Sequence, residues 1–516
     1  MASPREGASD PIVERWTDAW RRPRRISPAT RAAILRAMRP DPGAGVDVAV
    51  ARRGERLPAG AQLVLEDGTD LGSPVRIGPA VPHGYHRLRL ADGGERLLLL
   101  APRRCFLPAR LREWGWALQL YALRSAGSWG IGDLRDLARF SAAGAGAAFA
   151  VVNPLGAPNP GPSPEPSPYY PSSRRFRSPL YLAISEVPGF AAAGAELPTL
   201  AARGEALNAE RLIDRRTVLE LKLRALELIW NAGGGALPEA VAGVRALRER
   251  RGASLDRWAR FALLTERHGP GWQSWPAELR DPGSRAVAAA VSAQPDRVAF
   301  HAWIQWLLDE QLRRAAASGL RLVMDLPIGF DPGGFDAWDW QDQLADARLG
   351  APPDVFNPSG QDWGLPPFAP ERLRQAGYGP LVETVRASME HAGGLRIDHD
   401  LGFFRQWWVP AGSSPGDGAY IRQPTDELLA VLAIESERAG ALVIGEDLGT
   451  VEAGVRRRLA AASILSTRLA IFERRAPGRW PRNALGAVTT HDLPTVAGII
   501  TGADLQDQVR AGLVPD

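Results

Sequence analysis

Arg396, Asp398 and His399 stand together at the end of a short apolar stretch, where their side chains could do chemistry. The stretch, residues 394–399 (GLRIDH), is typical of a buried strand, in which side chains repeat every two residues. Arg396 and Asp398 are therefore expected on one face, and the arginine charge favours an ionised carboxylate. This arrangement suits a nucleophile or a charge stabiliser, but a structural Arg–Asp pair explains the stretch equally well.

Carboxylates also stand at the ends of three other predicted strands: Asp325, Glu446 with Asp447, and Asp492 beside His491. In a barrel of parallel strands these ends meet on one rim, so a dense cluster of negative charge is expected there. Two explanations compete. The oxygens could bind Mg²⁺ or Ca²⁺, or the environments of the acids could separate their pKa values, as glycoside chemistry requires.

Two features favour carbohydrate chemistry over a metal site. No glycine-rich phosphate-binding loop precedes a helix in the required context, which weakens phosphoryl transfer as a reason for a metal. Aromatic rings suit the apolar faces of sugars. Six aromatic residues occur in the segments around the acids: Tyr169, Trp338, Phe356, Trp363, Phe368 and Phe403.

An alternation of short apolar strands and amphipathic helices positions these acids. The predicted strands are residues 116–123, 149–155, 321–327, 395–399, 441–447, 467–472 and 487–492. The predicted helices of this region are residues 130–144, 378–392, 425–439 and 452–461. Strand, crossover helix and strand make the parallel βα unit, so the pattern predicts an α/β fold, a (β/α)8-type TIM barrel with helical insertions.

The rest of the chain divides by pattern into smaller regions. Residues 1–40 are predicted to be a basic helical lead-in. Residues 41–110 contain short apolar runs separated by Asp-Gly turns, which predict a small antiparallel β-sandwich domain. Residues 111–516 would form the catalytic barrel, in which residues 185–300 are predicted to be a mainly helical inserted subdomain.

A proline-rich loop, residues 158–171, carries Tyr169 and is expected to be stiff and to form the rim of a pocket.

Composition and charge limit the class of partner. The chain has 516 residues with 62 basic and 58 acidic side chains, so its formal net charge of +4 gives no global attraction to polyanions. Arginines between residues 15 and 39 favour a solvated face over a local polyanion contact. Cys105 is the single cysteine, which excludes an intrachain disulfide and a cysteine-rich metal site.

Neither the N-terminal residues nor any apolar run has the character of a secretory signal or a membrane span. The sequence therefore predicts a cytoplasmic protein with no nucleic-acid or membrane partner, and leaves its oligomeric state open.

Six motifs in one order resemble those of the amylomaltases, or 4-α-glucanotransferases, of glycoside hydrolase family 77, which is related to the α-amylases. The motifs are QLYALRSAGSWGIGD (119–133), VNPL with EPSPYYPSSRRFRSPLYL (152–182), GAPPDVFNPSGQDWG (350–364), LRIDH (395–399), GEDLG (445–449) and TTHDLPT (489–495). The resemblance extends from about residue 114 to the C-terminus, and is to the form of the family that carries an N-terminal β-domain.

The resemblance implies catalytic roles for three acids. Asp398 matches the nucleophile that forms a covalent β-glucosyl-enzyme, and Glu446 matches the general acid/base. Asp492 matches the carboxylate that binds sugar hydroxyls and stabilises the transition state. Asp325 matches the family pattern less cleanly, and is expected in a structural or outer-rim role.

The resemblance also implies substrate contacts. Arg396 is expected to hold Asp398 ionised, and His491 to contact the same sugar. Tyr169 would line the donor side and Trp363 the loop over the acceptor, with His399 as a further substrate-binding residue.

The reaction implied is cleavage of an α-1,4 bond in a maltodextrin donor, storage of the glycosyl unit on Asp398, and transfer to the 4-hydroxyl of an acceptor glucan or glucose. No cofactor and no metal are expected, because both chemical steps use carboxyl groups. One alternative is an α-1,4-glucan hydrolase with the same residues.

The other alternative is an inactive glucan-binding protein with an incomplete barrel. Seven barrel strands are predicted, whereas the family has an eighth strand and its helix, and residues 505–511 predict only one helix near the end of the chain. An open barrel is expected to expose a strand edge and apolar surface.

Overall fold

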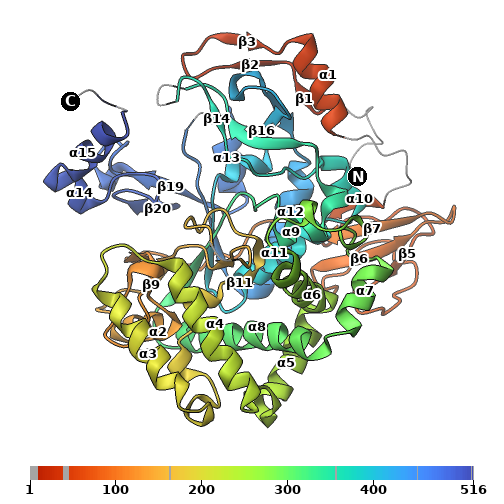
Figure 1. Ribbon diagram of the computed structural model, residues 1–516. Coiled ribbons are helices and arrows are strands. Elements are labelled where there is room, and N and C mark those ends of the chain that lie inside the picture. Colours follow the sequence, from red (N-terminus) through yellow and green to blue (C-terminus); the bar gives the residue numbers. More distant parts are fainter. Residues whose placement is uncertain are drawn as a thin grey trace.

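The computed structural model describes residues 10–38, 46–161, 164–354, 357–449, 451–512 and 514. At its centre is a seven-stranded parallel sheet (Figure 1). Its strands lie side by side in the order in which they occur in the sequence, with strands of other sheets between some of them along the chain. In sheet order the strands are β8 (Gly115–Leu118), β9 (Phe149–Val152), β12 (Arg321–Leu326), β15 (Gly394–Ile397), β18 (Leu442–Gly445), β19 (Leu465–Leu469) and β20 (Ala484–Ala487). This is the predicted TIM-barrel-like α/β arrangement.

The crossover connections of this sheet contain helices. They include α2 (Leu134–Ala143), α8 (Pro295–Ala316), α11 (Gly379–Met389), α12 (Thr425–Ala439) and α13 (Val455–Ala461). The central strands β15 and β18 are buried along their whole length, as expected for strands covered on both faces. Helix α2 begins at Asp133, whose carboxylate caps the backbone N–H groups of Arg135 and Asp136.

Most of the long crossover between β9 and β12 is helical and packs beside the sheet (Figure 1, yellow to green). Five helices lie in or close to residues 185–300: α3 (Glu196–Ala206), α4 (Arg215–Asn231), α5 (Pro238–Arg251), α6 (Ala253–His268) and α7 (Arg285–Ser292). Their apolar faces join the largest core cluster, in which Trp258, Trp275 and Trp303 are at most 4% exposed. Burying such large rings stabilises the region by roughly 1.5–3 kcal/mol each.

The N-terminal segment differs from the predicted helical lead-in, because among its described residues, 10–38, only α1 (Pro28–Ala37) is an α-helix. β1 (Ile12–Val13) joins the edge of a five-stranded sheet by pairing with β17 (Ala419–Arg422), about 400 residues later in the sequence. β2 (Arg15–Thr17) and β3 (Pro23–Arg25) then form a hairpin. In these pairings the backbone N–H and C=O groups of the segment find hydrogen-bond partners. The local sequence pattern could not predict the pairing with β17, because that strand is distant in the sequence.

The five-stranded sheet, with β14 and β16 labelled, lies near the top of Figure 1, above β19 and β20 of the central sheet. Its order is β1, β17, β16 (Arg405–Pro410), β13 (Ala347–Ala351) and β14 (Gln361–Asp362). All of its pairings are antiparallel.

The predicted β-sandwich is a single four-stranded sheet in the described part of the chain. Its order is β4 (Asp47–Ala51), β7 (Glu95–Leu100), β6 (Gly84–Arg89) and β5 (Gln62–Val64), and β4 pairs with β7 in parallel. One face carries Leu98 and Leu100 into a small core of its own, whereas Val48 and Leu99 pack against helix α12. A barrel helix therefore covers the face for which a second sheet was expected.

The C-terminal arm, residues 465–512, contains β19, β20, α14 (Val496–Thr501) and α15 (Ala503–Arg510), and extends from the body in Figure 1. β20 ends at Ala487, so the predicted strand 487–492 is wrong in its bounds and the TTHD motif lies in a loop. Neither helix has a buried residue within the described ranges. Large apolar side chains are exposed along the arm: Ile471, Phe472, Val488, Val496, Ile499, Ile500 and Leu505.

β8 and β20 form the two edges of the central sheet and are not paired with each other in the described residues. No helix within the described ranges combines the length and apolar character needed to cross a membrane.

Candidate active site

The carboxyl ends of β15 and β18 bring Asp398 and Glu446 together. Ile397 pairs with Gly445 across the two parallel strands, so the two acids follow at equivalent positions of neighbouring strands, whose backbones in a sheet lie about 4.8 Å apart. The Glu446 carboxylate accepts hydrogen bonds from the backbone N–H of His399 at 3.0 Å and from that of Leu448 at 3.1 Å. The register of two buried strands therefore fixes both acids.

Arg396 links Asp398 to a third acid. Its Nη1 donates to Asp398 Oδ1 at 3.1 Å and to Asp325 Oδ1 at 2.6 Å, because Asp325 on β12 is the sheet partner of Arg396. The hydroxyl of Tyr169 donates to Asp325 Oδ2 at 2.6 Å. Of the two roles expected for Asp325, structural or outer-rim, the contacts favour the structural one: its side chain is buried beside Arg396, where it holds both Arg396 and Tyr169 in place.

Burial and charge raise the pKa values of Asp398 and Glu446 to different extents. Burial raises the pKa of Asp398 to about 6, since it outweighs the opposing charge of Arg396 and is reinforced by the charge of Asp325. Burial, with the charge of Asp398, raises the pKa of Glu446 to about 7. Arg396 thus favours the ionised form of Asp398 as expected, but does not cancel the cost of burial. Between these values Asp398 is ionised while Glu446 keeps its proton.

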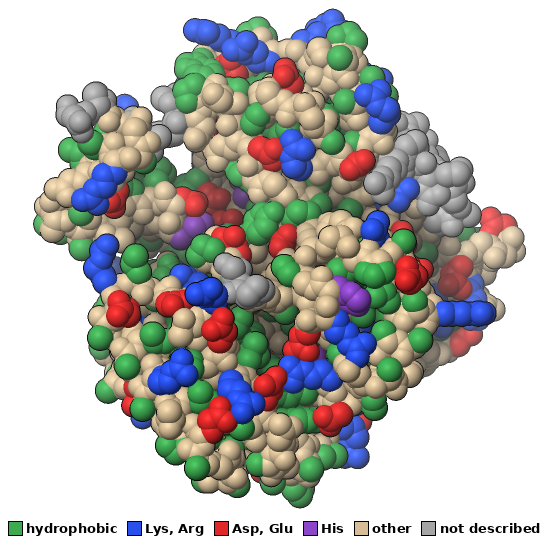
Figure 2. Space-filling view, viewed as in Figure 1, with side chains coloured by type: hydrophobic (Ala, Val, Ile, Leu, Met, Phe, Trp, Pro, Cys, Tyr) green, Lys and Arg blue, Asp and Glu red, His purple; other side chains and the backbone are tan. Residues whose placement is uncertain are grey.

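His491 and Asp492 reach this cluster from the C-terminal arm. The ring of His491 stacks on that of Tyr169, with centroids 3.7 Å apart and an interplanar angle of 12°. His491 Nε2 lies 3.0 Å from Asp492 Oδ1, and the Asp492 side chain is 72% exposed. Partial burial raises the pKa of Asp492, but the hydrogen bond and charge of His491 lower it further, to a net value below the usual one. Figure 2 shows acidic and histidine side chains in the hollow beside this arm.

His399 and Trp363 line the other side of the cluster. His399 has a left-handed backbone conformation (φ 50°), which is strained for a residue with a side chain and is typical of functional sites. Burial lowers the pKa of His399 to about 4, so its ring is neutral at physiological pH. Its ring meets that of Trp363 edge to face at 5.3 Å, and both line a cavity of about 190 Å³.

Three of the other aromatic residues proposed for sugar contacts pack in the core, and the fourth lies outside the described residues. Trp338 is fully buried in the main core, and Phe368 packs against Phe330 and Trp340. Phe403 packs against buried core clusters, and Phe356 lies outside the described residues. Composition around a motif thus did not distinguish rings in the core from rings at the site.

Asp447 follows Glu446 but turns into the protein. It is fully buried, where it accepts hydrogen bonds from Arg456 Nε at 2.7 Å and from the backbone N–H of Thr467 at 3.0 Å. These contacts tie the end of β18 to β19, so its role is structural.

Asp400 is a buried acid that the sequence analysis did not single out. Neither of its carboxylate oxygens has a hydrogen-bond partner within the described residues. A β-carbon at position 445 would overlap this carboxylate, so Gly445 leaves the space that Asp400 occupies. Burial, with the charges of Asp447 and Glu446, raises the pKa of Asp400 well above its usual value. The only signal in the sequence was a second aspartate two residues after Asp398.

A possible metal-binding group lies away from these acids. Asp309, Glu390 and His391 are the described residues whose donor atoms come close enough to surround an ion. Glu390 and His391 precede β15, at the end of the strand opposite Asp398. Arg250 bridges Asp309 and Glu390 at 2.5 and 3.0 Å, and a bound guanidinium occupies the place of a cation.

Comparison with known proteins relates this site to a family. A sequence profile of the 4-alpha-glucanotransferase family matches residues 118–513. The 4-alpha-glucanotransferase of Mycobacterium tuberculosis (strain H37Rv) is 41% identical over 487 residues, which cover 86% of this chain and 66% of that protein. The one of Haemophilus influenzae is 35% identical over 466 residues, covering 83% of this chain and 67% of that protein. The chain thus spans about two thirds of the length of these relatives.

A solved structure shares the architecture. The crystal structure of amylomaltase from Corynebacterium glutamicum superposes with a TM-score of 0.84 at 31% sequence identity, covering 98% of this chain and 81% of that one. The likeness therefore includes the N-terminal regions as well as the central sheet.

Proposed function

The chain belongs to the 4-alpha-glucanotransferase family, and we propose that it transfers α-1,4-glucan segments from a maltodextrin donor to the 4-hydroxyl of an acceptor glucan or glucose. The observation that carries this proposal is that two neighbouring strands end in Asp398 and Glu446. The pKa of Asp398 is raised to about 6 and that of Glu446 to about 7. A retaining glycosidic reaction needs one ionised and one protonated carboxyl group on opposite sides of the scissile bond.

In the first step Asp398 attacks the anomeric carbon of the donor. Glu446 gives its proton to the glycosidic oxygen, the bond to that oxygen breaks, and the shortened glucan leaves as an alcohol. The product is a β-linked glycosyl ester on Asp398. The charge of Arg396 favours the carboxylate form of the nucleophile, and Asp325 with Tyr169 orients Arg396.

In the second step the acceptor replaces the leaving glucan. Glu446, now ionised, takes the proton of the acceptor's 4-hydroxyl, and that oxygen attacks the anomeric carbon. The ester bond breaks and Asp398 returns as a carboxylate, so two inversions give net retention. We assign Asp492 and His491 to the hydroxyls of the bound sugar, and Trp363 and His399 to the acceptor side. Neither step requires a metal or cofactor, because carboxyl groups make and break every bond.

The exposure of Asp492 favours a second candidate, an α-1,4-glucan hydrolase with the same residues. Its side chain is 72% exposed, so solvent reaches the edge of the cluster. Water that arrives before an acceptor sugar would release the glycosyl unit from Asp398 as a free sugar.

Incubation with maltotriose separates these candidates. Transfer predicts glucose together with a ladder of maltodextrins longer than the substrate, whereas hydrolysis predicts only shorter products. Asp342→Asn, a change at an exposed carboxylate outside the cluster, should give the same product pattern as the unaltered protein. Unchanged maltotriose would contradict both candidates.

A further inference from the structure

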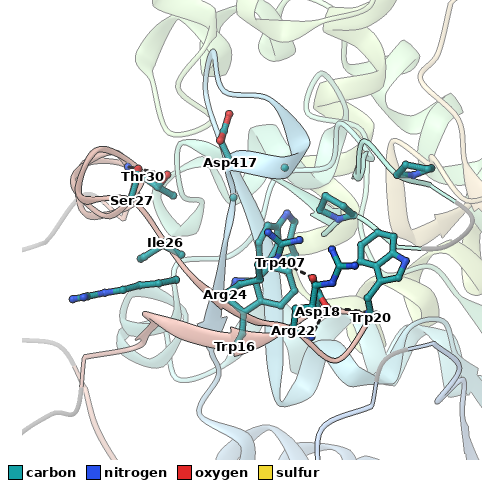
Figure 3. A pocket seen from close by; sticks show the side chains of 15 residues that line it. Trp16, Asp18, Trp20, Arg22, Arg24, Ile26, Ser27, Thr30, Trp407 and Asp417 are labelled. Atoms are coloured by element: carbon teal, nitrogen blue, oxygen red, sulfur yellow. Dashed lines mark hydrogen bonds and ion pairs between the residues drawn. The ribbon is translucent and has the colours of Figure 1, made fainter.

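A second and larger cavity, of about 450 Å³, lies between the N-terminal hairpin, the strand β16 and the loop that joins β16 to β17 (Figure 3). The residues that matter most in its lining are Trp16, Trp20, Arg22, Arg24, Trp407 and Asp417. Trp16 and Trp407 also line the smaller cavity that begins at His399 and Trp363. The two cavities therefore adjoin, and the smaller one extends to His399, the residue that follows Asp398.

The hairpin that forms one wall is held in a defined shape. Asp18 is almost completely buried, and its carboxylate accepts hydrogen bonds from the backbone N–H groups of Trp20 at 3.0 Å and Arg22 at 2.8 Å. The same carboxylate pairs with Arg24 Nε at 2.8 Å. Figure 3 shows these side chains grouped at the turn of the hairpin. Asp18 thus organises the turn that presents Trp20.

The aromatic rings of this wall differ in exposure. Trp16 meets Trp407 edge to face at 5.1 Å and Tyr420 at 5.6 Å, so it is anchored to the five-stranded sheet. Trp20 is 40% exposed, and its ring has no aromatic partner within the described ranges. An exposed tryptophan at the mouth of a cavity offers a flat apolar face to a ligand.

The cavity carries charges of both signs. Arg24 is paired with Asp18 and Arg25 lies 3.8 Å from Glu14, whereas Arg22 is exposed and Asp417 places a carboxylate on the facing wall. Hydrogen-bonding groups of both signs beside tryptophan rings suit a neutral molecule with many hydroxyl groups and apolar ring faces. That is the chemistry of a glucan.

We propose that this cavity is an accessory site that binds the far end of a long α-glucan whose near end lies at Asp398 and Glu446. The proposal rests on the proposed function, and it adds a preference for long chains. The hairpin lies outside residues 118–513, the segment that the family profile matches, so this preference comes from the N-terminal segment. Trp20 is then a specificity-determining residue that does not touch the reacting atoms.

Trp20→Ala tests this proposal through the ratio of kcat/KM on maltoheptaose to kcat/KM on maltotriose. Losing one stacking face is expected to lower this ratio roughly three- to ten-fold. Trp20→Phe keeps an aromatic face and should restore most of it. Trp114→Ala, at another exposed tryptophan on the edge of the central sheet, is the matched control and should leave the ratio unchanged. An equal loss on both substrates, or no loss on either, would overturn the proposal.

A binding measurement keeps this test independent of turnover. Maltoheptaose is titrated into the Asp398→Asn protein and into the same protein with Trp20→Ala added. The added change should raise the dissociation constant roughly three- to ten-fold. If the unaltered protein transfers nothing from maltotriose, the proposed reaction fails while this titration still decides the accessory site. Equal affinity of the two proteins for maltoheptaose would refute the site even where transfer is observed.

Discussion

The central acids and the C-terminal arm hold their functional side chains in different ways. Asp398 and Glu446 leave strands that are buried along their whole length, and their neighbours are fixed by sheet register. Asp492 leaves a loop after the edge strand β20, and is followed by two helices without buried residues in the described part of the chain. The comparison teaches that the core positions the two acids proposed to make and break bonds, whereas the acid proposed to bind the sugar is positioned by contacts at one edge of the sheet.

The same difference sets the pKa values. Burial raises the pKa of Asp398 and Glu446, whereas the contact with His491 lowers that of the exposed Asp492. The stacking of His491 on Tyr169 is the contact through which the arm reaches the central acids. Because a few contacts of this kind order the loop, the position of Asp492 should be less sharply defined than that of Asp398.

Replacing Asp398, the proposed nucleophile, should have the largest effect. Asp398→Asn leaves the shape of the side chain but cannot form the glycosyl ester, so kcat should fall by a factor on the order of 10⁴ or more. Maltotriose disproportionation measures this change, with circular dichroism to verify the fold. Activity within ten-fold of the unaltered protein would exclude Asp398 as the nucleophile.

Breaking the central ion-pair network should impair both activity and stability. Arg396→Met leaves the buried carboxylates of Asp325 and Asp398 without their shared counter-charge, which should cost about 3–5 kcal/mol of unfolding free energy. Urea unfolding at pH 7 measures this loss. Asp398→Asn serves as a comparison, because it removes one of the charges and should cost less. A stability loss below 1 kcal/mol would show that the pair contributes no more than a surface one.

The equivalent change on the arm should affect activity alone. Asp492→Asn weakens hydrogen bonds to the sugar, so kcat/KM should fall by about 10²-fold. The melting temperature should remain within a degree or so, because an exposed side chain contributes little to stability. A fall in melting temperature as large as that of Arg396→Met would contradict the contrast between the two regions.

The pH profile should reflect the central pair. The proposed reaction requires an ionised Asp398 and a protonated Glu446, so activity should fall below about pH 6 and again above about pH 7. The two limbs belong to the coupled pair and give a narrow optimum between these values. Initial rates of maltotriose transfer from pH 4.5 to 9 measure the profile, and a broad plateau up to pH 9 would rule out Glu446 as the proton donor.

The smallest effect is expected at Asp400. Its folded-state pKa is raised, so the folded protein binds a proton more tightly than the unfolded chain does, and this contribution to stability is lost as the pH rises. Asp400→Asn keeps a neutral group of the same shape. The unfolding free energy of the variant, relative to the unaltered protein, should therefore increase between pH 5 and pH 8 in parallel denaturant titrations. A constant difference across this range would mean that Asp400 does not titrate.

Motif and periodicity predicted six of the seven central strands, placed the last one three residues late, and predicted the grouping of the acids near their carboxyl ends. Residues 425–439 were predicted as a helix and form α12 with the same bounds. The roles of Asp398, Glu446 and Asp492 stay predictions, as do the domain boundaries. The sequence failed where a partner is distant: β1 pairs with β17, and Asp325 is held by Arg396 and Tyr169 from two other segments.

The sequence by itself determined which residues can do chemistry and which strand ends carry them, because strand periodicity and motif order are local properties of the chain. Only the tertiary structure decided which of the acids are buried. Strand register placed Glu446 beside Asp398, and the resulting loss of solvent raised both pKa values. It also placed the hairpin of Trp20 beside the catalytic cavity, since that contact joins segments almost 400 residues apart.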